Sequence, residues 1–205
     1  MTTIQFEHKA TSFSKINLAY FAYCANIIYR PKEKIHYELR RLGFDLSRDN
    51  FFFEYKNDDI DTQCFAVGDK EKIIVAFRGS EANLEDWVTN KKFLKTSWPK
   101  DNPLGRVHRG FYDALESIWL GDKLQKEILK LRTNGQSIWF TGHSLGGALA
   151  VLAAATLHLQ EKKDGFLGGV YTFGQPRLGN PDFAENYNAA LKERTYRVVN
   201  NNDLI

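Results

Sequence analysis

The sequence predicts an α/β protein built on a mostly parallel sheet with helices on both faces. From residue 108 onward, short apolar stretches typical of buried strands alternate with stretches of helical periodicity. Before residue 80, by contrast, three strand-like stretches follow one another without a helix between them. Crossover helices imply parallel pairing and short turns imply antiparallel pairing, so we expect the early strands along one edge of the sheet.

Two helices are expected before the first strand. Apolar side chains recur at helical spacing in the first of them, at Leu18, Phe21, Ala22, Ala25, Ile28 and Tyr29. This spacing predicts an amphipathic helix packed on the domain. Asparagines interrupt the stretch and no small-residue cleavage site follows it, so we do not interpret it as a signal peptide. A second helix is expected to open at Pro31 and to end at Gly43.

The remaining elements follow from the same periodicities. Strands are expected at 51–55, 62–69, 72–79, 137–142, 168–174 and 194–200, with a weaker candidate at 91–98. Helical faces are expected at 111–118, 124–131 and 144–160, with a further helix after Asn180 and Pro181. In such a sheet, catalytic and ligand-binding residues lie at the carboxyl ends of the strands.

Composition and charge exclude several classes of protein. A net charge of +3 gives no argument for nucleic-acid binding. Cys24 and Cys64 are too few for a disulfide scaffold, although one disulfide remains open, and they show no metal-ligand spacing. No apolar run is long enough to span a bilayer. With no signal peptide recognised, we expect a cytoplasmic location.

The stretch from Gly142 to Gly146 fits the pattern G-x-S-x-G and lies between an apolar strand and a helical run. In that setting Ser144 sits in a sharp turn that raises its hydroxyl above the sheet edge. Side chains two positions before and after would collide with backbone, which explains both glycines. The helix start offers N–H groups to an oxyanion. The alternative is that Ser144 only caps the helix. A phosphate-binding loop is not indicated, because the pattern G-x-x-x-x-G-K-[ST] is absent.

Several ordered motifs resemble the class 3 lipases, the fungal-lipase-like branch of the α/β-hydrolases. They are "VAFRGSEANLEDW" (75–87), "VHRGFYDAL" (107–115), "TGHSLGGALA" (141–150), "TFGQPRLGN" (172–180) and "YRVVNNNDLI" (196–205). The resemblance covers roughly residues 60–205. It implies a single α/β-hydrolase domain over 1–205, with N-terminal helices in 1–50 and the core sheet and nucleophile elbow in 51–205.

The resemblance also assigns roles to individual residues. It makes Ser144 the nucleophile and Asp203 the acid of a catalytic triad, with the N–H groups of Ser80 and Leu145 forming the oxyanion hole. It places a lid at Glu81–Trp87 and implies neither a metal nor an organic cofactor. Taken alone, Ser80 is also compatible with an ordinary turn residue, and Asp203 with a solvated turn acid among asparagines.

The triad also needs a histidine, which in this fold follows the acid. None follows Asp203 in this sequence. We therefore expect the histidine beyond residue 205, and a chain that lacks its C-terminal elements and hydrolyses esters feebly on its own. The function expected is that of a lipase or esterase acting on acylglycerols or related lipids through an acyl-enzyme on Ser144. The alternative is a non-catalytic module that binds an acyl ligand or a protein.

Two interactions besides substrate binding are expected. One hypothesis is contact with an anionic lipid surface, and the alternative is a solvated strand and loop. The cationic side chains concerned are Lys91, Lys92, Lys95, Lys100, Arg106 and Arg109, and they interleave with Phe93, Leu94 and Trp98. An exposed edge at the last strand is expected to promote self-association.

Overall fold

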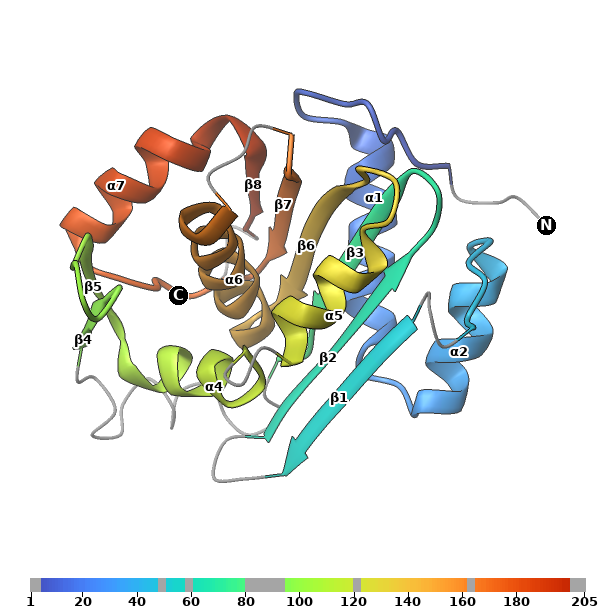
Figure 1. Ribbon diagram of the computed structural model, residues 1–205, viewed down its shortest axis with the longest axis horizontal. Helices are drawn as coiled ribbons and strands as arrows, with labels where there is room; N and C mark the ends of the chain where they lie inside the picture. The colour runs from blue at the N-terminus through green and yellow to red at the C-terminus, as the bar shows by residue number, and fades with distance from the viewer. Residues whose placement is uncertain are drawn as a thin grey trace.

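The computed structural model describes residues 5–47, 51–57, 61–79, 95–119, 123–161 and 165–199. Its centre is a six-stranded sheet in the order β1-β2-β3-β6-β7-β8 (Figure 1). The strands of this sheet are β1 (Phe51–Asn57), β2 (Asp61–Gly68), β3 (Lys72–Phe77), β6 (Ser137–His143), β7 (Leu167–Phe173) and β8 (Thr195–Val198). The helices are α1 (Lys15–Ile27), α2 (Lys32–Arg41), α4 (Arg109–Trp119), α5 (Lys123–Leu131), α6 (Leu145–Glu161) and α7 (Pro181–Leu191), with a 3-10 turn at Lys192–Arg194.

Strand direction in the sheet changes at β3. The strands β1, β2 and β3 pair antiparallel, whereas β3, β6, β7 and β8 are all parallel. Connections through α4 and α5, through α6 and through α7 return the chain between the parallel strands. The predicted α/β class, with its antiparallel strands along one edge, is therefore confirmed.

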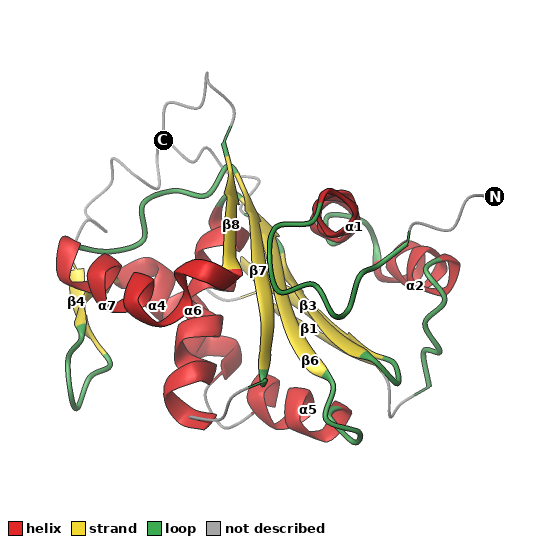
Figure 2. Cartoon of the chain, turned by 90° about the horizontal axis from the view of Figure 1, so that it is seen from above, coloured by secondary structure: helices red, strands yellow, loops and turns green. Residues whose placement is uncertain are grey.

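Helices cover both faces of the sheet (Figure 2). On one face lie α1 and α2, and the Phe21 ring of α1 stacks on Tyr171 and Trp139, with ring centroids 4.8 and 5.6 Å apart. The other face carries α4, α5, α6 and α7. Helix α6 is apolar on nearly every side, and it can therefore be buried between the sheet, α4 and neighbouring elements.

A small hairpin outside the main sheet was only half predicted. Strand β4 (Lys95–Trp98) pairs antiparallel with β5 (Gly105–His108) beside α7. The first four residues of the candidate strand 91–98 lie outside the described residues, and β5 was not predicted. The Trp98 ring is buried and meets Phe183 of α7 edge-on, with centroids 5.4 Å apart.

The two cysteines are buried on opposite faces of the sheet and form no disulfide. Cys24 belongs to the core beneath α1, and Cys64 belongs to the core around α6. A disulfide between them, which the sequence left open, is therefore excluded. Within the described ranges, no helix combines the length and apolarity that crossing a bilayer requires.

Candidate active site

The turn between β6 and α6 holds Ser144 in a strained conformation. Its φ of 55° is the only positive value at a non-glycine residue among those described. Such a value costs an L-residue conformational energy and is typical of functional positions. The Ser144 N–H donates to the Phe173 carbonyl at 2.9 Å, and its carbonyl accepts from the Gly147 N–H at 3.0 Å. These bonds hold the turn between β7 and the first turn of α6.

The flanking glycines permit this tight turn. An ideal Cβ on Gly142 would lie 2.2 Å from the carbonyl carbon of Gly146. A Cβ on Gly146 would lie 2.2 Å from the carbonyl oxygen of Phe77 in β3. Both separations are far below van der Waals contact, so any side chain would push α6 away from the sheet. The half-buried Ser144 is thus set at the sheet edge, beside the start of the helix.

The chain leaving β3 lies against the same turn. An ideal Cβ on Gly79 would be 3.3 Å from the Ser144 Cβ and 2.7 Å from the His143 carbonyl oxygen. Ser80, the next residue, lies outside the described residues. Leu145 begins α6 with its side chain buried, and the first amides of a helix have no acceptor within the helix. The parallel register therefore brings the end of β3 and the start of α6 together around Ser144.

Tyr29, just after α1, also reaches the site, which sequence reasoning missed. Its hydroxyl accepts a hydrogen bond from the Gly79 N–H at 3.1 Å and lies 3.1 Å from Nδ1 of His143. The guanidinium of Arg78 lies over its ring, 5.5 Å from the centroid. In the sequence Tyr29 fits the apolar periodicity of the first helix, and no local signal distinguishes it.

The proposed acid lies further along the chain than the described residues extend. Strand β8 runs parallel to β7, and the Val198 carbonyl accepts from the Gly174 N–H at 2.9 Å. The carboxyl end of β8 therefore lies at the same sheet edge as Ser144. Asp203 follows that end but, like the predicted lid at 81–87, falls outside the described residues.

The described histidines show no second member of a triad. His8 pairs with Glu71 at 3.6 Å, at the turn where β3 begins rather than ends. His36 meets the Phe51 ring edge-on, and His158 lies in the last turn of α6. His143 directs its Nδ1 at Tyr29. His108 ends β5, with its ring 4.5 Å from that of Phe111.

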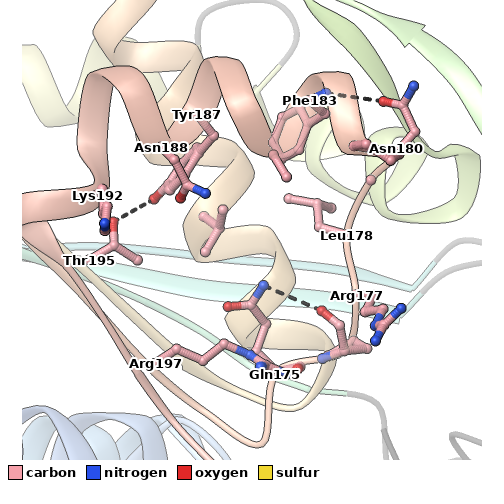
Figure 3. Close-up of a pocket in the computed structure, with 15 residues that line it drawn as sticks. Gln175, Arg177, Leu178, Asn180, Phe183, Tyr187, Asn188, Lys192, Thr195 and Arg197 are labelled. Carbon is pink, nitrogen blue, oxygen red and sulfur yellow. Dashed lines mark hydrogen bonds between the residues drawn. The ribbon is translucent and has the colours of Figure 1, made fainter.

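A hollow in the described chain lies beside this site rather than in it. A cavity of about 560 Å³ is enclosed by α7, the loop after β7, and β8 (Figure 3). Gln175 and Arg197 lie on one side of it, and Phe183 and Tyr187 project from α7 on the other. The Arg197 guanidinium donates to the Gln175 carbonyl at 2.7 Å. Neither Ser144 nor Leu145 lines the cavity, so it is separate from the nucleophile turn.

Comparison with known proteins places these features in a family. Residues 74–205 match the family model described as lipase (class 3). A secreted mono- and diacylglycerol lipase of Fusarium solani is 37% identical over 134 residues, covering 65% of this chain. A lipase of Rhizomucor miehei is 36% identical and covers 68% of it. A fungal lipase solved in complex with an inhibitor superposes with a TM-score of 0.69 at 25% identity, covering 92% of this chain and 72% of that one.

These comparisons correct one expectation from the sequence. The Fusarium solani relative is named as secreted, so the predicted cytoplasmic location is wrong. The prediction depended on the lack of a recognisable leader. The chain spans only 38% of the length of each of the two curated relatives, and the residues at its start therefore carry no information about location.

Proposed function

The chain belongs to the class 3 lipase family, and on this basis we propose that it provides the nucleophile of a serine hydrolase that cleaves carboxylic esters. The observation that carries the proposal is the positive φ of Ser144 between two glycines that admit no side chain. This geometry raises a hydroxyl at the sheet edge beside the first turn of α6. The non-catalytic alternative has no observation in its favour.

The chemistry proposed is acyl transfer to water. The Ser144 Oγ attacks the ester carbonyl carbon while a histidine takes its proton, and the carbonyl oxygen becomes an oxyanion. The N–H groups of Leu145 and Ser80 stabilise this charge, each worth about 2.7–4 kcal/mol in a serine hydrolase. The alcohol leaves with the proton, and water then releases the acid from Ser144. Asp203 orients the histidine, which we place outside these 205 residues.

Acylglycerols are the proposed substrates. A relative 37% identical to this chain is named a mono- and diacylglycerol lipase, which supports an acylated glycerol over a small water-soluble ester. The positional preference and acyl chain length depend on a substrate cleft whose lid segment lies outside the described residues.

We also propose contact with an anionic lipid surface through the β4–β5 hairpin. Lys95, Lys100 and Arg106 are exposed there. Trp98, which the sequence placed on this surface, is buried in the protein and contributes nothing to it. Co-sedimentation with vesicles should therefore rise with their anionic lipid content, and binding that is indifferent to this content would remove the proposal.

A fluorophosphonate probe, which phosphonylates an activated serine, tests the catalytic assignment. We expect the natural full-length protein to be labelled at Ser144, located by peptide mass spectrometry. The Ser144→Ala variant should not react, and the isolated 205-residue chain should react far more slowly because it lacks the proposed base. Full-length folded protein that is not labelled would overturn the proposal.

A further inference from the structure

A single hydroxyl links the two loops that meet at the proposed active site. The Tyr29 oxygen lies 3.1 Å from the Gly79 nitrogen and 3.1 Å from Nδ1 of His143. These partners are 50 and 114 residues away along the chain. We propose that Tyr29 is a positioning residue, which fixes the chain that leaves β3 at Gly79 relative to the turn that holds Ser144. The inference rests on the proposed hydrolase function.

The first link satisfies a buried amide that the sheet does not pair. Strand β3 ends at Phe77, and the Arg78 N–H still donates to the Gln63 carbonyl at 2.9 Å. Gly79 is buried, and its N–H donates to Tyr29 instead. A buried N–H requires an acceptor, so the hydroxyl determines the path of the chain at this point. The approach is so close that a Cβ on Gly79 would lie 2.3 Å from the hydroxyl oxygen.

The second link reaches the nucleophile turn. A phenol oxygen can accept one hydrogen bond and still share its proton with an imidazole nitrogen. His143 directly precedes Ser144, and its imidazole meets the Tyr29 hydroxyl. The carboxyl ends of β3 and β6 are therefore connected through one atom, carried by a residue just after α1. Because catalysis is sensitive to misplacement of about 1 Å, this atom affects the rate through the spacing between the Ser144 turn and the chain that leaves β3 at Gly79.

The Tyr29→Phe variant tests the proposal because it keeps the ring and removes only the shared oxygen. In the natural full-length protein we expect kcat for ester hydrolysis to fall by about 10- to 100-fold with little change in KM. An interaction that positions groups for the transition state lowers kcat in this way, whereas lost substrate binding raises KM. Fluorophosphonate labelling of Ser144 should slow in parallel. Hydrogen exchange at the Gly79 amide, measured by NMR, should become faster.

Tyr20→Phe is the matched control. Tyr20 lies on α1, is buried, and has a hydroxyl with no hydrogen-bond partner among the described residues. Removing that hydroxyl should leave kcat and Gly79 exchange unchanged. Equal losses in both variants, or unchanged Gly79 exchange in Tyr29→Phe, would overturn the proposal. If the unmodified protein shows no ester hydrolysis, the proposed function fails, but Gly79 exchange still decides whether Tyr29 fixes the loop.

Discussion

At Gly146, one methyl group would change the spacing between α6 and β3. The Phe77 carbonyl oxygen occupies the space in which a Cβ would lie, 2.2 Å away. A backbone atom cannot move aside as a flexible side chain can, so helix or strand must shift. We expect Gly146→Ala to lower the free energy of unfolding by about 1–3 kcal/mol or more, measured by urea denaturation.

Gly147→Ala is the matched control for this prediction. The nearest atom to a Cβ at Gly147 is the Cβ of Gln175, 3.1 Å away, which is a much looser contact. Alanine also favours a helix interior over glycine by about 1 kcal/mol, which offsets part of the crowding. Equal losses for Gly146→Ala and Gly147→Ala would show that the close approach to Phe77 is not what the elbow requires.

The turn between β2 and β3 provides the clearest pH dependence among the elements. Partial burial raises the pKa of Asp69, but hydrogen bonds from the Lys72 ammonium and from the Glu71 and Lys72 N–H groups outweigh it and lower the pKa overall. Lys72 is itself buried, with its ammonium 5.1 Å from the centroid of the Phe6 ring and 5.0 Å from that of Phe44. The turn thus depends on an ionised Asp69.

A carboxylate whose pKa is lowered by folding stabilises the protein above its unfolded pKa, about 3.9 for aspartate. That stability is lost as the pH falls through the lower folded value. Asp69→Asn should therefore be less stable than the unmodified chain at pH 6, and the difference should shrink as the pH falls below about 4. Urea unfolding at several pH values measures it. A difference that stays constant from pH 6 to pH 3 would contradict the prediction.

Elements governed by local periodicity could be predicted from the sequence, and contacts between distant segments could not. The helices α1 and α6 and the parallel strands β6 and β7 follow patterns that extend over many residues. Strand β5 has only four residues, Gly105–His108, too few for a period to emerge. Its pairing with β4 and its place beside α7 depend on the tertiary structure.

The same distinction holds at the site. The turn at Ser144 is encoded within five residues, and the structure places it between a strand and a helix as the pattern requires. Tyr29 reaches the turn only because α1 packs across β6 and β7, which no local pattern indicates. The roles of Ser80 and Asp203 remain proposals, because both lie outside the described residues.

Across the whole molecule, the described sheet has β1 at one edge and β8 at the other. On β8, the Val198 carbonyl points toward β7, since it accepts from Gly174. Because backbone groups alternate in direction along a strand, the N–H of Arg197 points away from β7. No described strand pairs with it. A free edge of this kind is a template for pairing with another chain.

We therefore propose that the isolated 205-residue chain self-associates through β8, and we expect its weight-average mass to rise with concentration in sedimentation experiments. Arg197→Pro removes the outward N–H without touching the ladder to β7, so it should shift the chain toward monomer. Arg197→Ala loses the same side-chain bond to Gln175 but keeps the N–H, and it should associate as the unmodified chain does. A monodisperse monomer would contradict the proposal, and equal association by the two variants would assign the association to another surface. Both variants lose the Arg197 side chain, but only Arg197→Pro loses the backbone N–H that could pair with another chain. A difference in association between them therefore reports on pairing at the β8 edge.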